Sequence, residues 1–183
     1  EYCKMENISI DEVTMCASSK WNFSNVRPGL VGGHCIGVDP YYLLDRASSK
    51  GIKLPLIQNA RDINENKSIN VANRIYNSIC DLKISSPRIL LLGFAYKPNS
   101  CDIRNTKVSV VLNELKSKGL YADCFDPLVN IDEVYKEYGL SLLSSFSGIQ
   151  SYDLIIVMVE HDSILQLIQS CNESHIVYLR NLL

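Results

Sequence analysis

A short, uninterrupted apolar run in the middle of the chain limits the fold more than any other feature. Ile89-Leu90-Leu91-Leu92 follows Ser85-Ser86-Pro87-Arg88 and ends at Gly93. A strand made only of apolar residues buries both of its faces, as strands do in a parallel sheet that is covered by helices on both sides. The run therefore predicts an α/β domain whose first strand spans residues 88–93.

The rest of the second half alternates between helix and strand patterns. The expected elements are a helix over Thr106–Lys118, a strand over Tyr121–Phe125, a helix over Asp132–Tyr138, a strand over Asp153–Val159, a helix over Ser163–Gln169 and a strand over Ile176–Leu179. Such alternation is typical of strands that run parallel and are joined by helices. We predict a Rossmann-like, doubly wound and mainly parallel sheet over residues 85–183.

The first half is helical by period. Ser9 is placed to cap a helix that begins at Ile10, and a second helix is expected over Asp39–Ser49. A long third helix is expected from Pro55 to about Cys80, although the polar stretch 64–70 could break it. A helix of that length serves either as a spine between domains or subunits or as a surface helix. We predict an N-terminal helical segment whose long last helix connects it to the sheet.

Charge and cysteine usage exclude several classes of protein. Eighteen Lys and Arg residues balance twenty Asp and Glu residues without a block of one sign, so neither nucleic acid nor a membrane surface is an expected partner. The longest apolar run is strand-length, so no transmembrane segment is expected. The seven cysteines form no Cys-x-x-Cys pair and indicate reduced thiols of a cytoplasmic protein without a metal site.

The sequence Gly32-Gly33-His34-Cys35-Ile36-Gly37-Val38-Asp39-Pro40 is the strongest candidate for chemistry. If Asp39 is the N-cap and Pro40 the first residue of a helix, the Cys35 thiol lies near a helix N-terminus, which favours the thiolate. The glycines would let a substrate approach closely, and His34 and Asp39 would supply a base and a carboxylate. The alternative is a packing cysteine in a tight turn that starts a helix.

The loop after the first predicted strand indicates a nucleotide other than a dinucleotide. No Gly-x-Gly-x-x-Gly occurs in the chain, and the strand ending at Gly93 is followed by Phe94-Ala95-Tyr96-Lys97-Pro98. Ligands of open α/β sheets lie beyond the carboxyl ends of the strands. There, Tyr96 could stack on a base and Lys97 could bind phosphate.

Three separated blocks together resemble a known family. They are residues 23–43 around Cys35, residues 93–99 with Asp102-Ile103-Arg104, and the closing pair Arg180-Asn181. They resemble the UDP-glucose/GDP-mannose dehydrogenases, and His34 before Cys35 with Val38-Asp39-Pro40-Tyr41 after it is similar to the branch that acts on UDP-N-acetylglucosamine or UDP-N-acetylmannosamine. The resemblance implies an NAD-dependent oxidoreductase that oxidises the sixth-carbon alcohol of a UDP-N-acetylhexosamine to the uronic acid, for surface polysaccharide such as capsule.

The resemblance also implies roles for individual residues. Cys35 would hold the intermediate aldehyde as a thiohemiacetal and then as a thioester, and Asp39 would activate the water that releases the acid. The implied substrate-binding residues are Arg27, Gly29, Gly32, Gly33, His34, Tyr96, Lys97 and Arg180. Val38 and Arg104 would face NAD. The alternatives are a local salt bridge between Arg104 and Asp102, and a plain surface position for Arg180.

The same resemblance implies the organisation of the chain. Residues 1–84 would form a central helical domain that carries the cysteine loop and makes a homodimer, and residues 85–183 would form the UDP-sugar-binding domain. Since the sequence starts at Glu1 without Met and lacks the glycine-rich NAD fingerprint, we expect part of a longer protein that is inactive alone. Two other functions stay open: a non-catalytic nucleotide-sugar binding or dimerisation module, and a thiol-dependent hydrolase.

Overall fold

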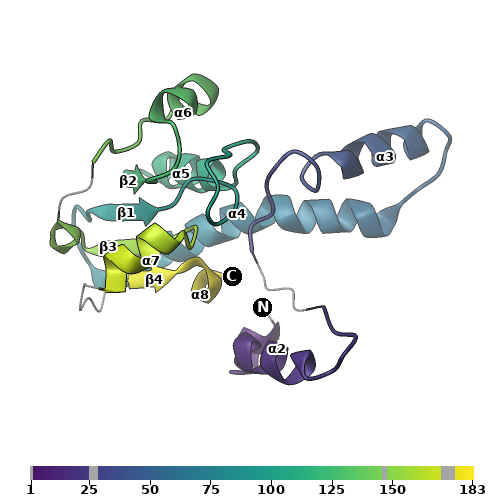
Figure 1. Cartoon of the computed structure of the whole chain (residues 1–183), viewed down its shortest axis with the longest axis horizontal. Coiled ribbons are helices and arrows are strands. Elements are labelled where there is room, and N and C mark those ends of the chain that lie inside the picture. Colours follow the sequence, from purple (N-terminus) through teal and green to yellow (C-terminus); the bar gives the residue numbers. More distant parts are fainter. Residues whose placement is uncertain (1, 25–28, 146–147, 170–175) are drawn as a thin grey trace.

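The computed structural model describes residues 2–24, 29–145, 148–169 and 176–183. It has an α/β part and a helical hairpin that projects from it (Figure 1). The hairpin consists of α3 (Asp39–Ser48) and the outer half of α4 (Pro55–Leu82), and α4 continues into the α/β part. No helix in these ranges combines the length and apolar character that a membrane span needs.

The α/β part is built on a four-stranded parallel sheet. Its strands are β1 (Ile89–Leu92), β2 (Ala122–Phe125), β3 (Leu154–Val157) and β4 (Ile176–Tyr178), in the order β2-β1-β3-β4. Leu91 in the centre pairs with Cys124 on one side and with Ile156 on the other. The sequence-based prediction of a parallel α/β sheet is confirmed, and each strand is shorter than predicted.

Helices cover both faces of this sheet. Ile89 and Leu91 point to one face, where they share a core with α4 and with α5 (Val108–Ser117). Leu90 and Leu92 point to the other face, where they pack with α7 (Asp162–Gln169). All four strand residues are at most 1% exposed, which explains why the run contains no polar residue.

The long helix α4 is continuous over 28 residues, so the polar stretch 64–70 does not break it. Asn64 and Ser68 are buried on its inner side, and farther along Val71 and Ile75 enter the core under the sheet. One half of α4 thus supports the hairpin and the other half supports the sheet. It acts as a spine within the chain.

Of the remaining elements, α2 (Ile10–Ser18) and α6 (Ile131–Tyr138) were predicted to within two residues. The short helices α1 (Tyr2–Met5), η1 (Ile149–Ser151, a 3-10 helix) and α8 (Leu179–Leu182) were not predicted. Ser9 caps α2 as expected, since its Oγ accepts a hydrogen bond from the Glu12 N–H at 3.3 Å. The helix α3 begins at Asp39, so the predicted N-cap role of Asp39 is wrong: Val38 is the N-cap, and no side chain caps this end.

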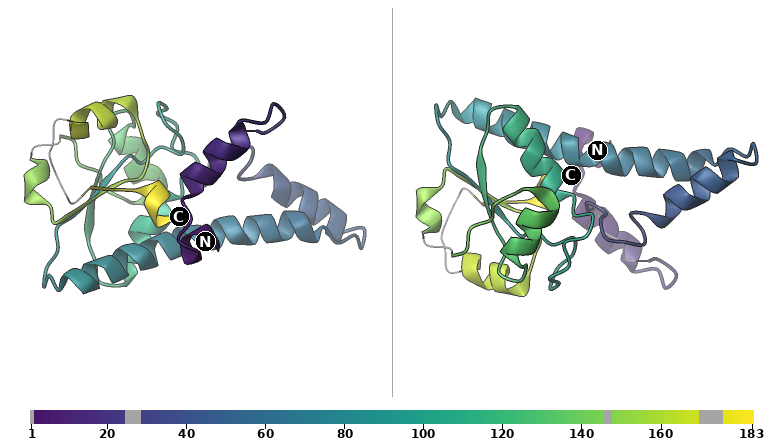
Figure 2. Two further views of the ribbon diagram at one scale, coloured as in Figure 1. Left: turned by 90° about the horizontal axis from the view of Figure 1, so that it is seen from below. Right: turned by 90° about the horizontal axis from the view of Figure 1, so that it is seen from above.

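At the C-terminal end, the predicted strand stops at Tyr178 and α8 follows. Two cations of α4 stabilise this turn of helix. Lys67 donates to the carbonyl of Leu183 at 2.6 Å, and Arg74 donates to the carbonyl of Leu182 at 2.7 Å. These carbonyls would otherwise lack partners at a helix end. Figure 1 and Figure 2 together show that α1 and α2 lie on the side of α4 where α8 and the C-terminus are found, set apart from α4 itself.

Candidate functional site

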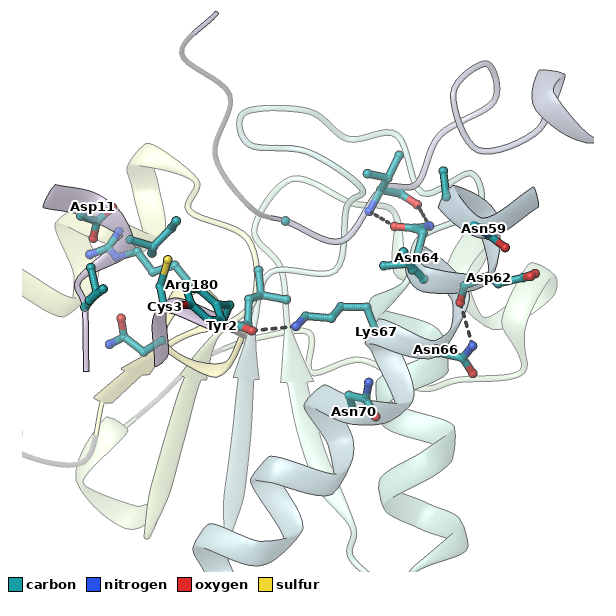
Figure 3. Close-up of a pocket in the computed structure, with 18 of the residues that line it drawn as sticks. Tyr2, Cys3, Asp11, Asn59, Asp62, Asn64, Asn66, Lys67, Asn70 and Arg180 are labelled. Atoms are coloured by element: carbon teal, nitrogen blue, oxygen red, sulfur yellow. Dashed lines mark hydrogen bonds between the residues drawn. The ribbon is translucent and has the colours of Figure 1, made fainter. Parts of the chain in front are cut away.

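The loop that carries Cys35 is held in place by two polar side chains of α4. The Asn64 amide pairs with the backbone of Val31: its Oδ1 accepts from the N–H at 3.0 Å, and its Nδ2 donates to the carbonyl at 2.9 Å (Figure 3). Arg61 donates from Nη1 to the carbonyl of Ile36 at 3.1 Å. Both side chains are buried, so these bonds fix the loop on both sides of the cysteine.

The glycines of this loop are required by a second loop, residues 94–106, that packs against it. Gly33 has φ +81°, and its N–H donates to the carbonyl of Arg104 at 3.0 Å. A Cβ on Gly33 would lie 2.9 Å from Cε2 of the Tyr96 ring, and one on Gly32 would lie 2.6 Å from the carbonyl oxygen of Asn105. The close approach predicted for a substrate is therefore made by Tyr96 and Asn105.

The Cys35 side chain is exposed. The N–H groups at the start of α3 bind the Cys35 backbone and not its thiol. Its carbonyl oxygen accepts hydrogen bonds from the N–H of Val38 at 2.9 Å and from that of Asp39 at 2.8 Å. These two donors are consequently not available to the thiol. The predicted activation by free N–H groups of the helix does not hold at these positions.

The second loop supplies a cation, Arg104, whose charge interacts with the Cys35 thiol. Arg104 makes a forked ion pair with Asp102, with Nη2 2.6 Å from Oδ2 and Nε 2.9 Å from Oδ1, as the local alternative expected. These hydrogen bonds lower the pKa of Asp102 to about 2, with a smaller contribution from His34. They also raise the pKa of Arg104, to which the charges of Tyr96 and Cys35 add. The exposed guanidinium is thus held by Asp102, and its positive charge interacts with the Cys35 thiol.

A cavity of about 400 Å³ opens where β1 and β3 end, beside the same two loops. Four predicted substrate-binding residues line it, namely Gly29, Tyr96, Lys97 and Arg180. The Lys97 ammonium lies 5.4 Å from the Tyr96 ring centroid. Arg180 lies over the Tyr178 ring and pairs with Glu160 at 2.8 Å, so it is held by partners and is not a plain surface residue.

The other predicted residues lie around this cavity or outside the described ranges. Gly32, Gly33, His34 and Cys35 belong to the adjoining loop, which contacts the cavity wall through Tyr96. Val38 and Asp39 lie at the start of α3 and do not line the cavity. Arg27 falls outside the described residues. Among those described, no three His, Cys, Asp or Glu side chains gather as a metal-binding group.

One residue of the cavity was missed by sequence reasoning. Lys107 lines it but is almost fully buried, and its Nζ pairs with both carboxylate oxygens of Glu65 at 2.7 and 2.8 Å. Glu65 also accepts a hydrogen bond from the hydroxyl of Tyr41 at 3.3 Å. The three residues connect α3, α4 and the start of α5. A lone lysine and a glutamate 42 positions apart give no local signal for such a contact.

A second, larger cavity of about 1420 Å³ extends along α4 toward α1 and α2. Figure 3 shows its polar lining, in which Asn59, Asn66 and Asn70 follow one another along α4. Gly29 and Arg180 line both cavities, so the two adjoin at the end of the sheet.

Comparison with known proteins covers almost the whole chain. Residues 1–66 match the UDP-glucose/GDP-mannose dehydrogenase family, central domain, and residues 90–183 match the UDP binding domain of the same family. Among curated relatives, the UDP-N-acetyl-D-glucosamine 6-dehydrogenase of Salmonella typhi is 40% identical over 163 residues, which is 88% of this chain and 38% of that protein. The Pseudomonas aeruginosa enzyme of the same name is 39% identical over 84% of this chain and 37% of its own length.

Solved structures agree on the fold. A UDP-D-ManNAc dehydrogenase from Pyrococcus horikoshii superposes with a TM-score of 0.76 at 23% identity, over 98% of this chain and 42% of that one. A UDP-glucose dehydrogenase from Pyrobaculum islandicum gives a TM-score of 0.73 at 17% identity, over 86% of this chain and 37% of that one. The chain thus spans well under half the length of the relatives it matches.

Proposed function

Because this chain belongs to the UDP-glucose/GDP-mannose dehydrogenase family, we propose that it supplies the UDP-sugar pocket and the nucleophilic thiol of an NAD-dependent UDP-N-acetylhexosamine 6-dehydrogenase. The observation that carries the proposal is the place of Tyr96, which lines the cavity and packs against the glycines beside Cys35. A sugar whose nucleotide lies in the cavity would reach toward the thiol. The uronic acid product suits surface polysaccharide synthesis.

The cavity has the charges that a nucleoside diphosphate needs. Lys97 and Arg180 bring two cations to the carboxyl ends of parallel strands, where such ligands bind. Glu160 orients Arg180 from one side while the Tyr178 ring supports it from another. We assign the diphosphate to Lys97 and Arg180, and a base or sugar face to Tyr96.

The chemistry of Cys35 fits its exposed position. Its thiolate would add to the carbonyl carbon of the sixth-carbon aldehyde, giving a thiohemiacetal, and removal of two electrons from that carbon would give a thioester. Attack of water on the thioester would release the carboxylate and return the thiol. The Asp39 side chain does not cap α3, so we assign its carboxylate the role of activating this water.

We assign Arg104 and Val38 to the binding of NAD. The guanidinium of Arg104 is held by Asp102, and its side chain is 55% exposed, so it can meet a phosphate that approaches from outside. Val38 follows Cys35 by three residues in the cysteine loop, and its N–H donates to the Cys35 carbonyl. When bound, NAD accepts the electrons of both oxidations. The chain itself has no Gly-x-Gly-x-x-Gly to cradle a pyrophosphate.

We further propose a homodimer through the central helices, in the reducing environment of the cytoplasm. The hairpin of α3 and α4 exposes large apolar side chains, among them Tyr42, Leu56 and Ile63, each at least 68% exposed. The six described cysteines are free thiols. Sedimentation of residues 1–183 at increasing concentration is expected to show a dimer. A monomer at every concentration would contradict this assembly.

Calorimetric titration with UDP tests the pocket. UDP is expected to bind one to one, and Lys97→Met is expected to weaken binding by about tenfold, because a charge-assisted contact with phosphate is lost. Lys118→Met is the matched control, since Lys118 pairs with Glu114 on α5 and does not line the cavity. Uridine, which has no phosphate, should bind equally to all three proteins. Equal UDP affinity of Lys97→Met and the wild type would contradict the assignment.

A further inference from the structure

A fully buried acid and base lie directly under the loop that forms the cavity wall. Asp126 follows β2 and His161 follows β3, and neither side chain is exposed to solvent. His161 Nε2 lies 3.0 Å from Asp126 Oδ2. Neither residue lines the cavity or belongs to the cysteine loop. Such a pair inside a protein is costly unless each polar atom has a partner.

Asp126 holds the beginning of the loop. Its Oδ2 accepts hydrogen bonds from the N–H of Phe94 at 2.6 Å and of Ala95 at 3.0 Å, and its Oδ1 accepts from the N–H of Leu128 at 2.9 Å. Burial alone would raise the pKa of Asp126, but the hydrogen bonds from His161 and from these N–H groups outweigh it and lower the pKa. Asp126 therefore stays a carboxylate.

His161 holds the end of the same loop. The backbone N–H of Asn99 donates to its Nδ1 at 2.9 Å. Nδ1 must therefore be free of a proton, and the single ring proton lies on Nε2, where it is donated to Asp126. The Asn99 side chain also exchanges two hydrogen bonds with Asp162, both 2.9 Å long. Asn99 has φ +55°, so these bonds stabilise a left-handed corner.

We propose that His161 is a positioning residue for substrate, acting in its neutral Nε2–H form through the bond from Asn99 to Nδ1. Between the two anchors, Ala95 and Asn99, lie only Tyr96, Lys97 and Pro98. Tyr96 and Lys97 line the cavity, and the Tyr96 N–H donates to the carbonyl of Asp102 at 3.1 Å within the same loop. Within the part of the chain that the structure describes, no side-chain hydrogen bond ties either residue to the sheet. The hydrogen bond from Asn99 to His161 thus helps to fix the position of the Lys97 ammonium relative to the ends of the strands. This inference deepens the proposed function and depends on it for the ligand.

Two conservative variants separate the two bonds of the imidazole. In His161→Asn the side-chain oxygen can take the place of Nδ1 and accept from Asn99, while the donor to Asp126 is lost. In His161→Gln the side-chain N–H can still donate to Asp126, while the acceptor for Asn99 is lost. The bond to the Asp126 carboxylate is charge-assisted and the bond from Asn99 is not, so His161→Asn should lose more thermal stability than His161→Gln.

Binding of UDP, measured by calorimetry on residues 1–183, should rank the two variants in the opposite order from their thermal stability. His161→Gln is expected to bind about tenfold more weakly than wild type, and His161→Asn within about threefold of it. A purely structural role predicts instead that affinity follows thermal stability in both. Equal affinities of the two variants would overturn the proposal.

Hydrogen exchange without ligand tests the same bond independently of UDP. In the wild type, the Asn99 amide is expected to exchange at least about tenfold more slowly than that of exposed Cys101. The amides of residues 95–97 and of Asn99 should exchange faster in His161→Gln but not in His161→Asn. If the wild type fails to bind UDP, the proposed function fails, whereas the exchange pattern still decides the role of His161. An Asn99 amide that exchanges as fast as Cys101 would overturn it, whether or not the variants fold.

Discussion

Cys35→Ser is expected to reduce NADH formation about a thousandfold or more in a chimera where this chain replaces the 163 matching residues of the Salmonella typhi relative. A serine hydroxyl is a far weaker nucleophile than a thiolate near neutral pH, and the ester it would form is hydrolysed less readily than a thioester. The measurement is NADH absorbance with NAD and UDP-N-acetylglucosamine. The structural reasons for the expectation are the exposed position of the thiol and its interaction with the positive charge of Arg104.

Cys101→Ser is the matched control for this loss. Cys101 is also an exposed free thiol and lies in the neighbouring loop, only three residues from Arg104. Its substitution should leave NADH formation within about twofold of the parent chimera, since surface changes away from a site have small effects. A Cys35→Ser chimera that keeps a tenth or more of the activity would exclude the thiol mechanism and favour a non-catalytic binding module.

Gly93→Ala is expected to lower the free energy of unfolding by about 3–5 kcal/mol, because two costs combine. Gly93 has φ +93°, outside the conformations that alanine adopts without strain. The new Cβ would also lie 2.5 Å from Cβ of Val159 and 2.8 Å from its backbone N and O. Val159 follows β3, one of the two inner strands of the sheet, so the backbone of that segment would have to move. Urea denaturation followed by circular dichroism measures the change.

Gly119→Ala separates these two costs. Gly119 has φ +79° at the end of α5, and nothing lies within 4 Å of the position that its Cβ would take. Gly119→Ala should lower the free energy of unfolding only by the cost of the left-handed conformation, about 1–2 kcal/mol. If Gly93→Ala costs no more than Gly119→Ala, the tight contact between Gly93 and Val159 is not present in solution.

The fold could be predicted from the sequence where burial or a local interaction determines the residue types along a segment. The apolar run 89–92 identified the central strand because both of its faces are covered, and Ser9 identified the start of α2 because capping is a local interaction. The boundary at Asp39 was wrong by one residue. Val38 and Asp39 donate to the Cys35 carbonyl, a turn that the Asp-Pro pair does not encode.

The candidate site was predictable only in its exposed part. Tyr96 and Lys97 were predicted because they follow a buried strand, and Arg180 was predicted from the family resemblance; the structure brings the three to one cavity. The residues that hold the loops escaped detection. Asn64 belongs to the polar stretch that suggested a break in the long helix, although it binds Val31 across 33 positions of sequence. His161 belongs to none of the motifs that the sequence shows. Hydrogen bonds between distant segments leave no periodic signal along the chain.

Affinity labelling of the thiol tests most directly whether pocket and nucleophile form one site. Residues 1–183 are incubated with a UDP derivative that carries a chloroacetyl group in place of the sugar, and the modified cysteine is identified by peptide mass spectrometry. We predict one label per chain, on Cys35, that excess UDP prevents. Labelling that UDP does not reduce, or that spreads equally over Cys35 and the other exposed cysteines Cys16, Cys80 and Cys101, would contradict a shared site.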